Sequence, residues 1–303
     1  MAKKGIAKFD FAAIASDIQD LAGKQIFFVG GVVKSGTSWV QHLLNLHPQV
    51  SCGGESHFID SLFPRLKTAL EEHNQHILDR AQNAFRYEVG EEPTIYGRDE
   101  LLHLLSTAIL LLMRAEARGK PALAIGEKTP SNLESFVMLG GLIPGSKCVQ
   151  IVRDPRDAAI SAWYHNWRMN PPEANKTAPT LAQFVMGFTE RWADSVGRGL
   201  EFAAAHPDRY LDIRYRDLLA EPGPTLARLC RFLGVDDGES VVRGCVEAAS
   251  FERLSGGRPR GQENLGSFFR KGVTGDWTNY LDAETQAHVI EKAGPLMARY
   301  GFR

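Results

Sequence analysis

Residues 30–38 have the types and spacing of a loop that binds an anion. The segment follows the apolar run Ile26 to Val29 and carries Lys34-Ser35-Gly36-Thr37-Ser38, and from Trp39 onward apolar residues recur at helical spacing. A strand, a glycine turn and a helix start together direct backbone N–H groups and the positive end of the helix toward an anion. The segment therefore predicts a phosphate cradle. An ordinary strand-to-helix turn, with glycines for close packing, is the structural alternative.

The loop differs from a Walker A loop in the position of its lysine. Walker A requires G-x-x-x-x-G-K-[ST], with the lysine directly after the second glycine. Gly31 and Gly36 have this separation and Ser38 is in place, but Thr37 occupies the lysine position and Lys34 lies inside the loop. A lysine there approaches a phosphate from a different side, and nothing in the loop requires a magnesium ion.

An arginine and a hydroxyl follow a later apolar run, residues 147–152. Arg153 comes directly after this predicted strand, and Ser161 lies about two turns into the helix that follows. A guanidinium with a nearby hydroxyl suits a second phosphate, because it supplies a planar fork of donors. Alternatively, Arg153 pairs with Asp157, or Asp154 caps the helix, which would leave Arg153 free.

Alternating strands and helices must position these loops. The strands are predicted at 26–29, 122–125, 147–152 and 210–214, with a loop or short strand at 47–54. The helices are predicted from 39 to about 46, and at 57–88 with a break at Pro64, 99–118, 133–141, 158–167, 181–205, 225–233 and 283–299. This alternation predicts an α/β fold with a mostly parallel sheet covered by helices on both faces, like that of P-loop NTPases. Ligands of such sheets bind beyond the carboxyl ends of the strands, where the loops 30–38, 126–132 and 153–157 are expected.

Composition limits the classes of function. The chain has 303 residues, 44% of them hydrophobic and 23% charged, with a net charge of -1, so no global basic field attracts nucleic acid or an anionic membrane. The N-terminus lacks the apolar core of a signal peptide, and the longest apolar run, 108–113, is too short to span a membrane. The four cysteines lack metal-ligand spacing. We therefore expect one domain over 1–303, with a helical lead-in at 1–24, reduced thiols, a cytoplasmic location and no metal.

Four segments, in order, resemble motifs of the sulfotransferases that use 3′-phosphoadenosine 5′-phosphosulfate (PAPS). The first is K-S-G-T-S-W at 34–39, which resembles the 5′-phosphosulfate loop, and the second is R-D-P-R-D-A-A-I-S at 153–161, which resembles the 3′-phosphate motif. The third is Y-L-D-I-R-Y-R-D-L-L at 210–219, where Arg216 replaces an acidic residue of the family, and the last is R-K-G-x-x-G-D-W from Arg270. Counted from the apolar run that precedes the first of them, they span residues 26–277.

The resemblance implies a role for each matching residue. Lys34 would contact the 5′-phosphate and the bridging oxygen that leaves, and Trp39 would pack on adenine unless it is an ordinary buried helix aromatic. The remaining 5′-phosphate cradle would be Ser35, Gly36, Thr37 and Ser38. The 3′-phosphate would be bound by Arg153, Ser161 and Arg270, with the backbone of Lys271 and Gly272. The adenine pocket would be completed by Tyr215 and Phe251, where Ala249 replaces a common threonine.

The general base differs from that of the cytosolic enzymes acting on phenols and steroids. Those enzymes use a histidine in a K-T-H segment, and here the segment is Lys128-Thr129-Pro130, with no proton acceptor at Pro130. The sequence H-P-Q-V-S-C-G-G-E, which ends at Glu55, instead resembles that of tyrosylprotein sulfotransferases and other Golgi-type enzymes. This resemblance implies that Glu55 is the base and that Lys128 stabilises charge on the transferring group. His57 is the second choice for the base, and Asp60 is a weaker one.

The implied activity is metal-independent transfer of the sulfuryl group from PAPS to a hydroxyl or amine. A P-loop small-molecule kinase and a catalytically inactive nucleotide-binding relative are the alternatives. The acceptor is a small molecule, a carbohydrate or a peptide, and the helical region 57–119 and the loop 255–269 are expected to shape its pocket. The basic, glycine-rich segment 255–275 is expected to lie over the nucleotide. A homodimer is implied by the resemblance alone.

Overall fold

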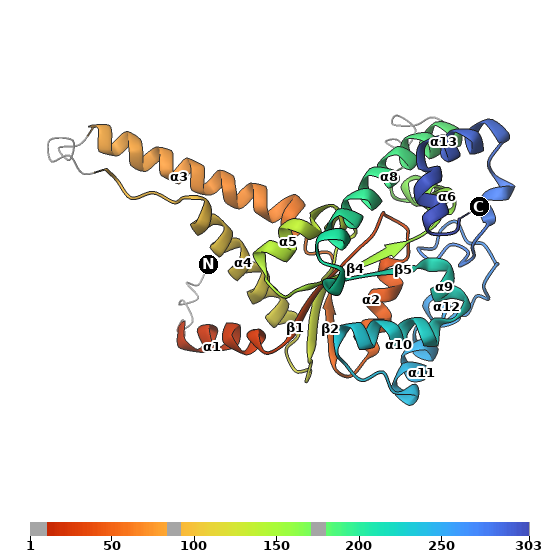
Figure 1. The fold of residues 1–303 in the computed structure, drawn as a ribbon, viewed down its shortest axis with the longest axis horizontal. Helices are drawn as coiled ribbons and strands as arrows, with labels where there is room; N and C mark the ends of the chain where they lie inside the picture. Colours follow the sequence, from red (N-terminus) through yellow and green to blue (C-terminus); the bar gives the residue numbers. More distant parts are fainter. Residues whose placement is uncertain (1–10, 84–91, 171–179, 303) are drawn as a thin grey trace, which may run out of the picture.

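The computed structural model describes residues 11–83, 92–170 and 180–302 and has an α/β fold built on one parallel sheet (Figure 1). The strands are β1 (Gln25–Gly30), β2 (Val50–Gly53), β3 (Ala124–Lys128), β4 (Lys147–Val152) and β5 (Tyr210–Arg214). They pair in parallel in the order β2-β3-β1-β4-β5. The start of the predicted lead-in at 1–24 and the end of the predicted helix at 57–88 lie outside the described residues.

Alternation along β1 explains why helices cover both faces of the sheet. Successive side chains of a strand point to opposite faces. Phe27 and Val29 therefore pack in one apolar cluster, with α2 (Thr37–Leu46) and α10 (Pro222–Leu233). Ile26 and Phe28 pack in the cluster on the other face, with α4 (Arg98–Glu116). A run that is apolar at every position is thus a strand buried on both sides, as in other doubly covered parallel sheets.

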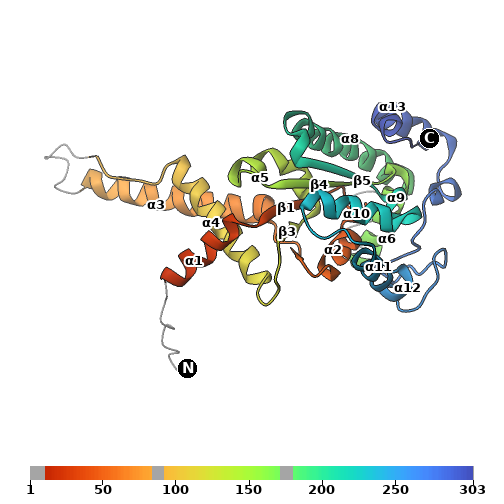
Figure 2. The same cartoon turned by 60° about the horizontal axis from the view of Figure 1, so that its bottom comes forward.

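The remaining helices complete these layers. A third apolar cluster joins α6, α8 and α13 beside the end of β4. Figure 2 shows that α8 and α10 lie on opposite sides of the sheet. The other α-helices of the described ranges are α1 (Phe11–Ala22), α3 (Phe63–Asn83), α5 (Phe136–Leu142), α6 (Pro155–Met169), α8 (Leu181–Ala205), α9 (Tyr215–Ala220), α11 (Glu239–Ala248), α12 (Phe251–Leu254) and α13 (Ala283–Arg299). None of the helices in the described ranges is long and apolar enough to cross a membrane.

Helix α3 extends away from the body of the molecule in both views (Figures 1 and 2). A π-helical turn, Phe58–Leu62, precedes it, and the α-helix then begins at Phe63. Pro64 therefore lies in the first turn, where a helix does not use the backbone N–H that proline lacks. Near the predicted break at Pro64, the structure has a change from π-helix to α-helix at Phe63.

The strand predicted at 122–125 lies two to three residues further along the chain than the sequence indicates. Residues 122–125 were predicted, but β3 runs from Ala124 to Lys128 because it pairs with β1 on one side and β2 on the other up to its polar end. Lys128 pairs in register with Val29 and so is the last strand residue rather than a loop residue. The helix predicted from 133 is also divided, into a 3-10 helix over Pro130–Ser135 and then α5.

Candidate active site

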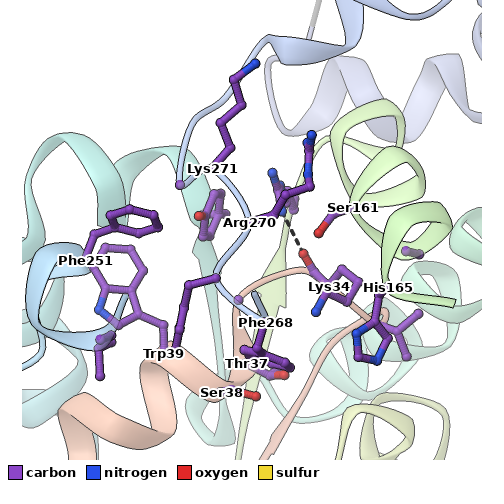
Figure 3. Close-up of a pocket in the computed structure, with 18 of the residues that line it drawn as sticks. Lys34, Thr37, Ser38, Trp39, Ser161, His165, Phe251, Phe268, Arg270 and Lys271 are labelled. Atoms are coloured by element: carbon purple, nitrogen blue, oxygen red, sulfur yellow. Dashed lines mark hydrogen bonds between the residues drawn. The ribbon is translucent and has the colours of Figure 1, made fainter. Parts of the chain in front are cut away.

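A cavity of about 380 Å³ lies where the carboxyl ends of all five strands meet. Each strand is followed by a residue that lines it, in the order Lys34, Glu55, Pro130, Arg153 and Tyr215. The three loops expected at this edge therefore do come together. The long segment 255–275 closes the cavity with Arg260, Phe268, Phe269, Arg270, Lys271, Gly272 and Val273. In Figure 3, Trp39 and Phe251 lie at one end, and Lys34 and His165 lie at the other.

Lys34 is held at the second of these ends by a strained backbone and an aromatic ring. Its φ is 67°, in the left-handed region that non-glycine residues rarely adopt. Its Nζ lies 3.9 Å from the centre of the Phe268 ring, within the range of a cation–π contact. Burial, reinforced by the charges of Arg168 and Arg153, lowers the pKa of Lys34 from 10.5 to about 8. Lys34 is thus a poorly neutralised cation that binding of an anion would stabilise.

The lowered pKa predicts a pH dependence of anion binding. Below pH 8 the ammonium of Lys34 is mainly charged, and above pH 8 the free protein has lost this proton. A bound phosphate favours the charged form, so binding above pH 8 must take up a proton. We expect the affinity for 3′-phosphoadenosine 5′-phosphate (PAP) to fall from pH 7 to pH 9 in calorimetric titrations. The fall should disappear in Lys34→Arg, since arginine stays charged; an unchanged slope would contradict this role of Lys34.

Gly36 is required at the turn between β1 and α2. Its φ is 101°, and a Cβ built on it would lie 2.6 Å from the Tyr215 ring. The backbone therefore passes against Tyr215, and Gly36, Thr37 and Ser38, at the start of α2, line the cavity. This is the geometry of the phosphate cradle that the sequence predicts.

Three aromatic side chains form the other end of the cavity. Trp39 and Tyr215 meet edge to face with 6.1 Å between ring centres, and the Trp39 indole N–H donates to the carbonyl oxygen of Ala249 at 2.9 Å. Gly272, at a φ of 71°, passes so close to Phe251 that an added Cβ would lie 2.5 Å from its ring. Trp39 is thus both packed in the core and part of the cavity wall, so the two interpretations of this residue do not exclude each other.

Arg153 connects the first loop to the C-terminal segment instead of pairing with Asp157. Its guanidinium donates to the carbonyl oxygens of Lys34 at 2.9 Å and Val273 at 3.2 Å, and lies 4.5 Å from the centre of the Tyr215 ring. Asp154 caps α6 by accepting from the backbone N–H of Arg156 at 2.9 Å, as expected. Ser161, two turns further along α6, lines the same cavity.

Arg270 has carboxylate partners within its own loop. It forms ion pairs with Glu263 and, at 3.1 Å, with Asp276. Asp276 also accepts from the ammonium of Lys271 at 2.6 Å, and Figure 3 shows the Lys271 side chain pointing away from the other labelled residues. Lys271 and Gly272 therefore border the cavity while the charge of Lys271 is directed to Asp276.

Three buried polar groups of the predicted site have no hydrogen-bond partner among the residues that the structure describes. They are the Ser35 hydroxyl, the Nε of Arg153 and the Nε of Arg270. Leaving such a group buried and unsatisfied costs about 1–3 kcal/mol, so most buried polar groups are paired. Unpaired donors at residues expected to bind two phosphates fit a ligand with oxygens at both positions.

Glu55 and Lys128, for which the sequence predicts the roles of base and charge stabiliser, form an ion pair. Glu55 Oε1 accepts from the Lys128 ammonium at 2.6 Å, and Lys128 also lies 3.4 Å from the Ser38 hydroxyl. Lys128 is 3% exposed, whereas Glu55 is 45% exposed and borders the cavity. His57, the second choice for the base, binds Asp60 at 3.0 Å, which raises the pKa of His57, and neither residue lines the cavity.

Two carboxylates for which the sequence predicted no function anchor loops of the site. Buried Glu127 accepts from the backbone N–H of Ser56 at 2.9 Å and from the Asn132 amide at 2.7 Å. It thereby fixes the loop that carries Glu55. Asp157 accepts from the N–H groups of Gly275 and Trp277 and anchors the C-terminal segment in the same way. Burial raises the pKa of both carboxyls, and these hydrogen bonds oppose the increase.

His165 and Arg260 also line the cavity and were not predicted. A signal for His165 exists, because it lies four residues after Ser161 and therefore on the same face of α6. By contrast, none of the described residues of 57–119 lines this cavity, and several of them border a separate groove between α3, α4 and α5. That 57–119 shapes the acceptor site stays a prediction. No cluster of metal-ligating side chains is found among the described residues.

Comparison with known proteins identifies the family to which this cavity belongs. The sequence profile described as "Sulfotransferase family" matches residues 26–239, which is most of the chain. The chain belongs to the sulfotransferase family. The resemblance inferred from the four motifs is thus confirmed.

Curated relatives of this sulfotransferase-family chain include cytosolic and protein-tyrosine sulfotransferases. Cytosolic sulfotransferase 16 of Arabidopsis thaliana is 29% identical over 56% of this chain and 57% of its own length. Protein-tyrosine sulfotransferase 2 of Gallus gallus is 23% identical over 91% of this chain and 69% of its own length. The alignments with the plant proteins thus cover only about half of their length.

Solved structures agree in fold. A mouse sulfotransferase complexed with PAP superposes with a TM-score of 0.54 at 19% identity, over 98% of this chain and 93% of the other. The sulfotransferase domain of the olefin synthase of Synechococcus PCC 7002 gives a TM-score of 0.53 at 21% identity, over 90% and 95% of the two chains. These likenesses support the predicted α/β architecture.

Proposed function

We propose that this sulfotransferase-family chain transfers the sulfuryl group of PAPS to a hydroxyl or amine of an acceptor, leaving PAP. The proposal is supported by the Nε atoms of Arg153 and Arg270, which are buried, have no hydrogen-bond partner among the described residues and belong to side chains that line one cavity with Lys34 and Glu55. The Ser35 hydroxyl, in the turn next to Lys34, is buried and unpaired in the same way. A cavity with two separate positions for anions and one end lined by aromatic side chains suits a nucleotide that is phosphorylated at both the 3′ and the 5′ position.

Different residues of the site would bind the nucleotide, remove the acceptor's proton and stabilise the developing charge. Trp39, Tyr215 and Phe251 would hold adenine, and Arg153, Ser161 and Arg270 would hold the 3′-phosphate. The turn of residues 34–38 would hold the 5′-phosphosulfate at the start of α2. Because the bridging oxygen gains negative charge as it leaves sulfur, Lys34 stabilises the transition state more than the ground state.

Glu55 is the proposed general base. It reaches the cavity from the loop after β2, with one carboxylate oxygen held by Lys128 at 2.6 Å and the other 3.8 Å from His57 Nε2. Removing the acceptor's proton as oxygen or nitrogen attacks sulfur avoids a positively charged product. Lys128, which also lies near Ser38 of the 5′-phosphate turn, is placed to neutralise sulfuryl oxygens.

A titration distinguishes this function from a kinase. We expect protein in EDTA to bind PAP at least about 100-fold more tightly than 5′-AMP, since each hydrogen bond to a charged group contributes about 1.5–3 kcal/mol. ATP should bind weakly whether or not magnesium is added. Tight binding of ATP that depends on magnesium would support the P-loop kinase instead. Tight PAP binding with no transfer to any acceptor would support the inactive relative.

The acceptor class and setting complete the proposal. Its relatives include cytosolic and protein-tyrosine sulfotransferases. We propose that the acceptor is a small molecule, a carbohydrate or a peptide. A cytoplasmic location is supported by four free, buried cysteines, Cys52, Cys148, Cys230 and Cys245. A homodimer is proposed from family analogy alone and is tested by light scattering.

A further inference from the structure

Glu127 is a buried carboxylate beside the two side chains that would carry out the transfer. It lies in β3 directly before Lys128 and is 0% exposed. The parallel pairing of β2 and β3 sets it opposite Gly53, and the chain continues from Gly53 into the loop of Glu55. Glu127 does not border the cavity where the nucleotide would bind. Any effect that it has on the reaction must therefore pass through its neighbours.

Three groups donate hydrogen bonds to the Glu127 carboxylate. The backbone N–H of Ser56 donates at 2.9 Å and the side-chain amide of Asn132 at 2.7 Å. The Thr129 hydroxyl donates at 2.5 Å, and its oxygen accepts in turn from the backbone N–H of His57 at 3.4 Å. Three donors around one buried carboxyl favour its ionised form, because an ionised carboxylate only accepts.

The donors belong to the two segments that carry the predicted base and the predicted charge stabiliser. Ser56 directly follows Glu55, and Thr129 directly follows Lys128. The Glu55 side chain itself is 45% exposed, so packing around it does little to fix its position. A side chain on a loop keeps a precise position only when the neighbouring backbone is held. The hydrogen bond from Ser56 to Glu127 supplies this hold.

We infer that Glu127 is a positioning residue for the transfer, which sets where Glu55 stands relative to Lys128 and the sulfuryl group. This inference rests on the proposed function. A general base acts only within hydrogen-bond reach of the proton that it removes, and a misplacement of about 1 Å costs about 10²-fold in rate. Glu127 takes no proton itself and acts through the backbone of Ser56.

Glu127→Gln tests this role with almost no change in side-chain size. The new amide would face the amide of Asn132, donor against donor, and the buried charge would be lost. Release of PAP from PAPS is measured with 2-naphthol, a small hydroxyl compound that serves as the probe acceptor. We expect kcat to fall by about 10–100-fold, as for a misplaced base. The affinity for PAP in calorimetric titrations should change little, because other residues would bind the nucleotide.

Two double substitutions separate positioning from general damage. If Glu127 acts through Glu55, Glu127→Gln should lower kcat little further once Glu55→Gln is present, whereas independent damage would multiply the two losses. Adding Asn132→Asp to Glu127→Gln gives the new amide a carboxylate to donate to. This pair should therefore recover part of the lost kcat.

Asp157→Asn is the matched control, because Asp157 is a second buried carboxylate that anchors a loop. It accepts from the backbone N–H groups of Gly275 and Trp277, which follow the part of the C-terminal segment that borders the cavity. We expect the opposite result from this variant. PAP binding should weaken, and kcat at saturating PAPS should fall less than in Glu127→Gln.

Hydrogen exchange tests the same hold without any acceptor. Glu127→Gln should accelerate amide exchange over 54–58 and leave 273–277 as in the wild type, and Asp157→Asn should do the reverse. Unchanged exchange over 54–58, or a kcat loss that multiplies with that of Glu55→Gln, would overturn the inference. A wild-type protein that binds no PAP would instead contradict the proposed function, and the exchange measurement would still decide whether Glu127 holds the loop.

Discussion

Glu55→Gln is expected to lower kcat for transfer to 2-naphthol by about 10²–10⁴-fold, the usual contribution of a general base. Glutamine keeps the size of the side chain and an oxygen for Lys128, but it cannot accept the proton of the acceptor. The affinity for PAP, measured by calorimetry, should change little, because the nucleotide is bound by other residues. A loss in kcat without a loss in PAP affinity identifies an interaction made in the transition state.

His57→Gln is the matched control for Glu55. His57 is the other side chain considered as the base, and it lies 3.8 Å from Glu55 while bound to Asp60. Because it does not line the cavity, its replacement should reduce kcat far less than Glu55→Gln does. The reverse order of effects would transfer the role of base to His57. Equal, small effects would show that neither side chain removes the proton.

Arg153→Ala is expected to weaken PAP binding by about 100-fold, since it deletes a charged donor from a buried anion site. The same substitution should change the affinity for 5′-AMP by much less, because that nucleotide lacks the 3′-phosphate. The difference between the two ligands isolates the 3′-phosphate contact from general damage. This comparison is needed because Arg153 also donates to the carbonyl oxygens of Lys34 and Val273, so its replacement removes two hydrogen bonds between loops.

The control for Arg153 is Arg198→Ala. Arg198 pairs with Asp194 on the surface of α8, where an exposed ion pair contributes about 1 kcal/mol or less. It should leave the affinities for PAP and 5′-AMP unchanged. If Arg153→Ala weakened both ligands equally, the residue would be a structural link between loops, and the 3′-phosphate would have to be bound by Ser161 and Arg270 alone.

Local pattern was sufficient for most of the sheet and helices. Strands β4 and β5 and helices α8 and α13 have the predicted bounds, because short segments rich in apolar residues and long amphipathic periods are strong local signals. The parallel order of strands then brings the loops after β1, β3 and β4 to one edge. The position of β3 was predicted less well, because its end is stabilised by two neighbouring strands and its own residues there are Glu127 and Lys128.

The sequence by itself therefore determined the architecture, the family and the edge at which the site forms, since these depend on local periodicity and on short motifs. The tertiary structure alone decided which side chains meet there. The pairing of Glu55 with Lys128, the hold of Glu127 on the Ser56 backbone and the contact of Arg153 with Val273 each join residues about 70 to 120 positions apart. No local pattern encodes such contacts, because they exist only once packing has brought separate loops to the same end of the sheet.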